Sequence, residues 1–300
     1  MRVPATATAT APASVSAAAS ASAADVRTRT AELPNNLSLV YTEYGDAAQS
    51  AGAVLLLHGG AGPRSVAGFA AALARRSPVL VPTHPGFDGT PRPRWSDTVA
   101  DLAVAYLDLL DALDLTDVLV VGSSVGGWIA AEMALRDTRG RVRALTLIDA
   151  AGIEGAPGRE VADVAALGPV ALSELSFHRP EFRPDFSAFD DTQKAAMAAN
   201  RRTLAVYAGE PYMHDPKLRG RLHRIGVPAL VLWGEHDGVT PLAYGHEFAR
   251  AIPGARFVPV ADSAHFPFVE NPEVVLAQLA AFRDEAAAVG PSAVSPRLQR

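Results

Sequence analysis

The sequence predicts an α/β fold in which a mainly parallel sheet is covered by helices on both faces. Three observations lead to this prediction. Short apolar runs rich in valine and leucine recur along the chain. Several of them end at glycine or proline turns, and helix-length stretches with amphipathic spacing lie between them. Most of the runs are continuous rather than alternating, which indicates strands buried on both faces, as in parallel sheets.

The expected strands and helices alternate from Leu37 onward. Strands are expected at residues 37–44, 53–57, 79–81, 118–121, 142–148, 229–233 and 257–260, and helices at residues 97–113, from the turn at 122–127 through 134, and at 272–282. The first strand alternates apolar and polar residues, as an edge strand does. Ser96 is placed to cap the helix that begins at Asp97. Strands and helices in this order build βαβ units.

The two ends of the chain differ in composition from the part between them. Residues 1–34 are rich in Ala, Ser and Thr, so we expect a disordered tail. A secretory signal is the alternative, since residues 20–23 resemble a small-residue cleavage site. Only Arg2 supplies a positive charge before that site, however, and the leucine-rich middle of a signal is missing. We therefore expect a cytoplasmic protein, with a second loose tail at residues 290–300.

The stretch at residues 152–226 interrupts the alternation of strands and helices. It contains no clear β run, and prolines separate its helical patches. Because a plain loop of this length is rare in a compact domain, we expect an inserted helical lid. The core of the fold is then formed by residues 35–151 and 227–289.

Composition and charge exclude several classes of function. Hydrophobic residues make up 49% of the chain and charged residues 20%, as in soluble globular proteins. The formal net charge of −5 argues against nucleic acid as a partner. No apolar run approaches the roughly 18 residues that cross a membrane. The chain has no cysteine, which excludes disulfides, thiolate metal sites and a cysteine nucleophile. A small-molecule substrate is the expected partner.

The motif Gly122-x-Ser124-x-Gly126 lies between an expected strand and an expected helix. This is the arrangement of a nucleophile elbow, a sharp turn that lifts a serine hydroxyl clear of the sheet. Glycine is needed on either side because the turn presses the backbone against its neighbours. A glycine-rich phosphate-binding turn is the alternative, but the chain contains neither G-x-G-x-x-G nor G-x-x-x-x-G-K-[ST].

Two later strand ends supply the expected partners of the serine. Asp237 follows the strand at 229–233, and His265 follows the strand at 257–260. The chain order Ser, Asp, His is that of a triad on this kind of sheet. Glu235 and Asp149 are the competing candidates for the acid. We expect Ser124 to attack a carbonyl carbon, His265 to remove its proton and Asp237 to orient the imidazole.

The turn after the strand at 53–57 is the expected second half of an oxyanion hole. Its sequence, His-Gly-Gly-Ala-Gly-Pro from His58, is poor in side chains, so a backbone N–H of Gly60 or Ala61 can point at the developing charge. The N–H of Val125, at the start of a helix, is the expected first donor. This chemistry requires no metal and no organic cofactor.

Five segments in the same order resemble the lidded α/β-hydrolases, which include esterases, lactonases, cofactor-free haloperoxidases and carbon–carbon bond hydrolases. They are HGGAGP from His58, HPGFDGT from His84, GSSVGG from Gly122, WGEHDGVTP from Trp233 and SAHFPFVENPE from Ser263. The resemblance extends over residues 37–282. It implies an α/β-hydrolase fold, a lid between the strands at 142–148 and 229–233, and a serine nucleophile.

The chain departs from this resemblance at a few positions. The carbon–carbon hydrolases typically have G-N-S-M-G-G at the elbow and His-Trp at the base, whereas this chain has Ser123, Val125 and Phe266. His84 replaces an acidic residue often seen before Pro-Gly-Phe in the family, and we expect a structural role for it.

Substrate choice is expected to depend on the lid. Its aromatic side chains include Phe177, Phe182, Phe186 and Tyr207. Most of them are expected to form the core of the lid, and some to line an apolar pocket above Ser124. Arginines such as Arg179 are expected on solvated faces rather than at a substrate carboxylate.

The leading hypothesis is a serine hydrolase that cleaves a carboxylic ester or lactone of medium size through an acyl-enzyme. Cleavage of a carbon–carbon bond in a vinylogous diketone is the alternative within the same enzyme class. A receptor that binds a small molecule without turnover is the alternative from another class, because one fold hosts many functions. Acyl transfer to an alcohol remains a further variant of the leading hypothesis.

Overall fold

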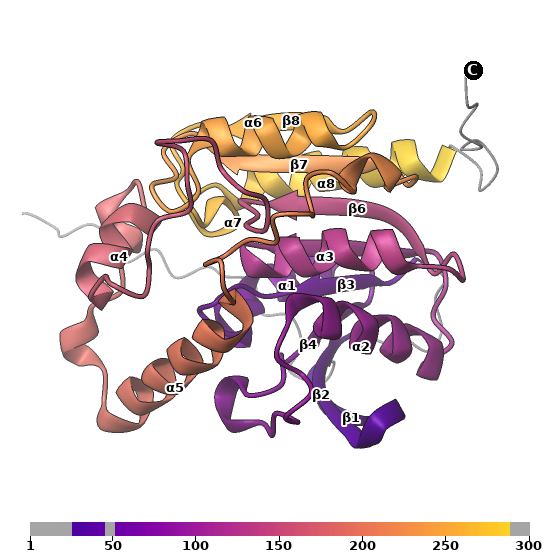
Figure 1. Ribbon diagram of the computed structural model, residues 1–300, viewed down its shortest axis with the longest axis horizontal. Coiled ribbons are helices and arrows are strands. Elements are labelled where there is room, and N and C mark those ends of the chain that lie inside the picture. Colours follow the sequence, from indigo (N-terminus) through magenta and orange to yellow (C-terminus); the bar gives the residue numbers. More distant parts are fainter. Residues whose placement is uncertain (1–25, 46–51, 289–300) are drawn as a thin grey trace, which may run out of the picture.

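The computed structural model describes residues 26–45 and 52–288. An eight-stranded sheet with strand order β1-β2-β4-β3-β5-β6-β7-β8 forms its centre (Figure 1). The strands are β1 (Val26–Leu33), β2 (Leu37–Tyr44), β3 (Val54–Leu57), β4 (Val79–Pro82), β5 (Val118–Ser123), β6 (Val142–Ile148), β7 (Ala229–Gly234) and β8 (Arg256–Val260). β3 to β8 run parallel, and β2 is antiparallel to both of its neighbours, β1 and β4. The predicted, mainly parallel sheet is confirmed.

The N-terminal prediction is wrong for residues 26–34. These residues form β1 and the start of a turn rather than a tail, so β1 is the edge strand and β2 pairs on both sides. β-branched Val and Thr favour the extended backbone, and Arg29 pairs with Glu43 of β2 at 2.5 Å. Asn35 and Asn36, both at positive φ, make the turn between the strands. The rest of the predicted N-terminal tail and the tail at 290–300 lie outside the described residues.

Helices cover both faces of the sheet (Figure 1). They are α1 (Ala67–Leu73), α2 (Val99–Ala112), α3 (Val125–Arg136), α4 (Pro169–Ser176), α5 (Asp191–Ala208), α6 (Leu242–Ala251), α7 (Pro267–Glu270) and α8 (Pro272–Ala288). Side chains of α2, α3 and α6 share one apolar core with the sheet, and those of α1 and α8 share a second core. Within the described ranges, no helix is both long and apolar enough to span a bilayer.

The predicted N-cap of α2 is two residues too early. Thr98 caps the helix, because its hydroxyl accepts the Asp101 N–H while the Asp101 side chain accepts the Thr98 N–H, which completes a capping box. Ser96 is buried instead, and its hydroxyl lies 3.0 Å from the Tyr207 hydroxyl. Serine and threonine both suit an N-cap, but only Thr98 has an acidic residue, Asp101, three positions later to complete the capping box.

Residues 149–228, which we call the inserted segment, connect β6 to β7. They hold α4 and α5 with short 3-10 turns between them, and no strand of the sheet. Figure 1 shows the two helices together at one end of the sheet. Both helices lie within residues 152–226, where a helical lid is expected, and the role of this stretch as a lid stays a prediction.

Candidate active site

Ser124 occupies a strained turn between β5 and α3. Its φ of 56° and ψ of −123° lie outside the regions that non-glycine residues prefer, and its side chain stands where the strand becomes the helix. Its carbonyl accepts the N–H groups of Gly127 and Ala151, and its own N–H donates to Ile148. These bonds hold the strained backbone in place.

The two glycines of the motif are required by close backbone packing. A Cβ on Gly122 would lie 2.2 Å from the carbonyl oxygen of Gly126, and a Cβ on Gly126 would lie 2.2 Å from that of Leu57. Real Cβ atoms essentially never approach backbone so closely. The steric reason for the G-x-S-x-G spacing therefore holds in this chain.

Asp237 and His265 form a buried pair at the ends of β7 and β8. The Nδ1–H of His265 donates to Oδ2 of Asp237 at 2.8 Å. The carboxylate also accepts the N–H groups of Val239 and Thr240 on Oδ1, at 2.7 and 3.0 Å. The hydroxyl of Thr240 donates to Oδ2 at 2.5 Å. Four donors hold the carboxylate, which in turn fixes the imidazole tautomer with Nε2 as the free base.

The acid that sequence order selects is the one bonded to the histidine. Glu235, its local competitor, is exposed. Asp149 is fully buried beside the pair, and its carboxylate oxygen lies within 4.8 Å of ligand-type atoms of both Asp237 and His265. It accepts the Gly234 N–H on Oδ1 at 2.9 Å. Burial, and then the neighbouring Asp237 charge, raise the pKa of Asp149 well above its ordinary value.

Asp149→Asn is expected to stabilise the protein increasingly as pH rises. A carboxyl with a raised pKa in the folded state binds a proton there that the unfolded chain has lost, so its contribution to stability falls as pH rises above about 4. Asparagine keeps the acceptor for Gly234 and supplies an N–H toward Asp237. Thermal unfolding at pH 5, 7 and 9 measures the effect, with the exposed Asp284→Asn as control. A stability difference that stays constant with pH would contradict this expectation.

The glycine turn after β3 lies directly beside Ser124. A Cβ on Gly59 would lie 3.0 Å from Cβ of Ser124. Val125 is the first residue of α3, so its N–H has no acceptor within the helix. Of the two expected oxyanion donors, Gly60 thus belongs to the glycine turn beside the serine, and Val125 directly follows the serine as the first residue of α3. Their role in holding charge stays a prediction.

Two buried histidines, His58 and His84, are hydrogen-bonded to the backbone of the glycine turn. The rings of His58 and His84 stack with centroids 3.6 Å apart. Nδ1–H of His58 donates to the Gly59 carbonyl at 2.7 Å, and Nε2–H of His84 donates to the His58 carbonyl at 2.8 Å. Nδ1 of His84 therefore accepts from the Tyr106 hydroxyl. Burial lowers the pKa of His58 to about 4 and that of His84 well below its ordinary value, so both are neutral. The geometry supports the expected structural role of His84.

The end of α4 is hydrogen-bonded to the turn that holds Asp237 (residues 235–241, here the acid turn) and to the loop that holds His265 (residues 261–266, here the base loop). The His265 N–H donates to the Ser176 carbonyl at 3.0 Å, and the Gly238 N–H donates to the Leu175 carbonyl at 3.1 Å. The buried carboxylate of Glu270 accepts the N–H of Ala264 at 2.7 Å and that of Arg179 at 2.8 Å. One side chain thus joins the base loop to the inserted segment.

Helix α5 contacts the glycine turn beside Ser124. A Cβ on Gly60 would lie 2.5 Å from Cδ2 of Leu204, so this leucine packs on the glycine turn. Ser124 is 8% exposed. The serine is therefore buried, and whether the inserted segment acts as a lid over it stays a prediction.

The model of the Alpha/beta hydrolase family matches residues 54–278. The chain belongs to the alpha/beta hydrolase family.

Individual relatives of this hydrolase are distant. The chain is 28% identical to an uncharacterised protein of Mycobacterium tuberculosis, over 75% of this chain and 73% of that one. It is also 28% identical to a pimeloyl-[acyl-carrier protein] methyl ester esterase of Chromobacterium violaceum, over 75% of this chain and 89% of the esterase.

Solved structures share the fold of this hydrolase. A membrane phospholipase A, described as a bacterial virulence factor, superposes with a TM-score of 0.73 at 24% identity, over 88% of this chain and 87% of that one. An esterase from Exiguobacterium antarcticum superposes with a TM-score of 0.69 at 20% identity, over 85% of this chain and 98% of that one.

The four aromatic residues singled out in the sequence occupy different surroundings in this hydrolase. Phe177 is buried and stacks on Phe266, the neighbour of the base, with centroids 5.0 Å apart. The guanidinium of Arg179 lies 4.5 Å above the Phe182 ring. Phe186 packs edge-on against another phenylalanine of the inserted segment. Tyr207 is buried, and its hydroxyl donates to the Pro85 carbonyl. Phe177 thus contacts the residue next to His265, and contact of any of the four with substrate stays a prediction.

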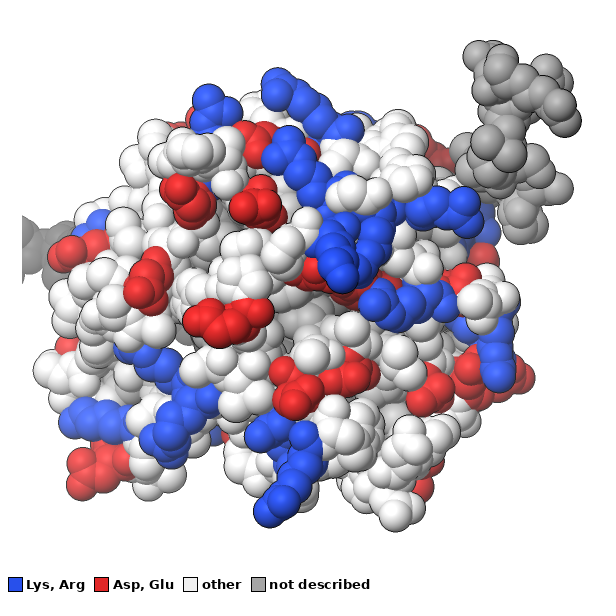
Figure 2. Space-filling model, in the orientation of Figure 1, with Lys and Arg blue, Asp and Glu red and all other residues white. Residues whose placement is uncertain are grey.

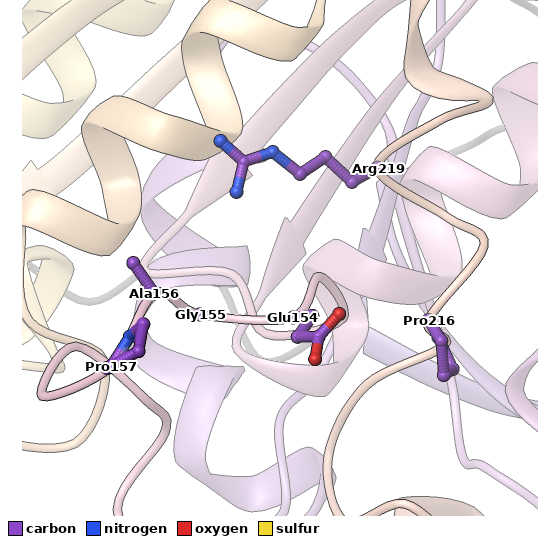
Figure 3. A pocket seen from close by; sticks show the side chains of 6 residues that line it. All are labelled: Glu154, Gly155, Ala156, Pro157, Pro216 and Arg219. Atoms are coloured by element: carbon purple, nitrogen blue, oxygen red, sulfur yellow. The ribbon is translucent and has the colours of Figure 1, made fainter.

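A surface hollow of about 270 Å³ lies apart from this site (Figure 3). It is lined by Glu154, Gly155, Ala156, Pro157, Pro216 and Arg219. The guanidinium of Arg219 is paired with Glu247 at 3.0 Å. Ser124, Asp237 and His265 do not line the hollow, so it is separate from the candidate site. Basic and acidic side chains are interspersed on the face shown in Figure 2.

Sequence reasoning missed Thr240 and Glu270. An aspartate often accepts a backbone N–H from the residues that follow it in the same turn. The bonds from Val239 and Thr240 to Asp237 could therefore have been predicted from the sequence. Glu270 lies in a helix after the base, and its two acceptor contacts come from segments far apart in the chain. No local pattern indicates them.

Proposed function

We propose that this hydrolase cleaves a carboxylic ester or lactone of medium size and apolar character through an acyl-enzyme on Ser124. One observation carries the proposal. A strained serine at the end of β5 and a buried Asp237–His265 pair at the ends of β7 and β8 stand at the same edge of one parallel sheet. A nucleophile and an oriented base at one edge are what acyl transfer to a serine requires.

In the proposed reaction, Nε2 of His265 takes the proton of Ser124 as its oxygen attacks the carbonyl carbon. The N–H groups of Val125 and Gly60 stabilise the oxyanion. The tetrahedral intermediate collapses and the leaving alcohol takes the proton from His265. Water, activated by the same imidazole, then releases the acid and restores the serine. The named ester hydrolase among the relatives supports this reaction class.

We propose that the inserted segment acts as a lid. Leu204 rests on the glycine turn, and the serine has little exposure, so a substrate reaches it only when α5 moves away. Apolar residues such as Phe177 and Leu204 then favour an apolar acyl or ring group over a charged one.

A fluorophosphonate probe tests the nucleophile. It is expected to add one adduct to the folded protein, on the peptide that contains Ser124, because only an activated serine reacts with it. Protein unfolded in guanidinium is the control and should stay unlabelled. Folded protein that stays unlabelled would refute the proposal.

Turnover assays separate ester cleavage from its alternatives. A p-nitrophenyl ester series of increasing acyl length is expected to be hydrolysed, with a preference for medium chains. Turnover of a vinylogous diketone but not of the esters would favour carbon–carbon cleavage. Tight binding of small molecules with labelling but no turnover would favour a receptor.

A further inference from the structure

A second cluster of potential ligands lies on the surface next to the Asp237–His265 pair. His178, His236 and Asp262 are all exposed, and one ligand atom of each lies within 4.8 Å of those of the others. We propose that these three residues bind a transition-metal ion of the Zn²⁺ class, at a site separate from the reacting serine.

The three residues come from three segments that the backbone already holds together. The His236 N–H donates to the Ser263 carbonyl at 2.9 Å, which fixes the acid turn to the loop that contains Asp262. His178 lies between Ser176, whose carbonyl accepts the His265 N–H, and Arg179, whose N–H donates to Glu270. The backbone that carries the ligands is thus fixed before an ion binds. The conformational entropy lost on binding is then mainly that of the exposed side chains.

The donor set selects the class of ion. Two imidazole nitrogens and one carboxylate oxygen suit Zn²⁺, Ni²⁺ or Cu²⁺, whereas Mg²⁺ and Ca²⁺ prefer oxygen ligands. Three protein ligands leave one position of a tetrahedron to water. The other close cluster among the described residues, Asp149, Asp237 and His265, is buried, and its Asp237 and His265 are already bonded to each other.

Binding requires a small rearrangement of the two imidazoles. Their rings are stacked, with centroids 3.8 Å apart and planes 11° from parallel, so their lone pairs do not yet converge on one point. Nitrogens that share a tetrahedral Zn²⁺ ion lie about 3.3 Å apart, given Zn–N bonds of about 2.0 Å. Both side chains are exposed, so rotation of one ring about its side-chain torsions can bring both nitrogens to the ion.

A bound ion would tie the inserted segment to the loops of the acid and the base. His178 belongs to the inserted segment, and His236 and Asp262 belong to the two loops. The ion therefore favours the arrangement in which the segment covers the serine. An ion that binds only the folded state also raises the temperature of unfolding.

Isothermal titration of untagged, chelator-treated full-length protein with ZnCl₂ tests the proposal. One Zn²⁺ per chain is expected to bind, and MgCl₂ is expected to give no comparable binding. His178→Ala and His236→Ala should each weaken the Zn²⁺ affinity at least tenfold, because each removes one ligand. Zn²⁺ at about tenfold above its Kd should raise the Tm by about 3 °C in the unmodified protein and by less in both variants.

His223→Ala is the matched control, because His223 is an exposed histidine outside the cluster. This variant should bind Zn²⁺ as the unmodified protein does. Absence of stoichiometric binding, binding that survives either histidine substitution, or an equal loss in the control would overturn the proposal. The titration needs no turnover, so its failure would leave the proposed hydrolase activity to be judged by the labelling experiment alone.

Discussion

Ser124→Ala is expected to lower ester turnover by about 10⁵- to 10⁶-fold, the scale at which serine triads lose activity when their nucleophile is removed. The oxyanion donors and the binding surface remain, so the variant should keep a residual rate above that of water. Its stability should stay close to that of the unmodified protein, because serine and alanine meet the same strain at φ 56°. Values of kcat/KM for a p-nitrophenyl ester, with Tm measured in parallel, test both statements.

Ser123 provides the matched control for this substitution. It is the adjacent buried serine, and its hydroxyl has no hydrogen-bond partner among the described residues. Ser123→Ala should therefore leave turnover within a few fold of the unmodified enzyme. If Ser124→Ala kept most of its activity, or if the Ser123 variant lost as much, the assignment of the nucleophile would be wrong.

Gly126→Ala is expected to destabilise the fold by about 3 kcal/mol or more. The new Cβ would lie 2.2 Å from the Leu57 carbonyl oxygen and 2.7 Å from that of His58. Both contacts are with backbone at the end of β3, which cannot rotate away as a flexible side chain can. The α3 helix would have to move off the sheet, and Ser124 would move with it. Urea unfolding gives the free energy, and fluorophosphonate labelling should be lost as well.

Gly68→Ala is the control for the glycine substitution. Gly68 lies in α1, and a Cβ there has nothing within 4 Å. Because alanine favours a helix over glycine by about 1 kcal/mol, this variant should be slightly more stable than the unmodified protein. Equal effects of the two substitutions would show that the close contact at Gly126 relaxes freely.

The sheet was predictable because its strands are continuous apolar runs that end at conspicuous turns. β6 matches its predicted range at both ends, and β5 and β7 extend the prediction by one or two residues at the turn. β1 was missed because its alternating Thr and Arg follow an Ala-rich stretch without a break in polarity. β1 is a strand because it pairs with β2, and its own sequence pattern does not indicate this pairing. α1, with only seven residues, is too short for a periodic pattern to be recognised.

The sequence predicted which three residues form the candidate site, because their order along the chain indicates them. Each of its three candidate residues follows a strand, and parallel strands bring their carboxyl ends to one edge. The residues that surround these three depend on contacts between segments that are far apart in the chain. The contact between Gly60 and Leu204, and the position of Asp149 beside the acid, join residues more than 80 positions apart. Sequence spacing carries no information about either.

The Glu270 carboxylate has a consequence for enzyme engineering. Exchanging residues 149–228 for the corresponding segment of another hydrolase is a natural route to new substrate preferences. The Arg179 N–H that Glu270 accepts and the Ser176 carbonyl that receives the His265 N–H are backbone groups, so a chimera keeps these bonds only where its backbone follows the same path. Otherwise a buried carboxylate loses one donor, and the His265 N–H loses its acceptor. A functional graft must therefore bring equivalent groups at both positions, which makes the junction near residue 179 the part of the donor sequence to match first.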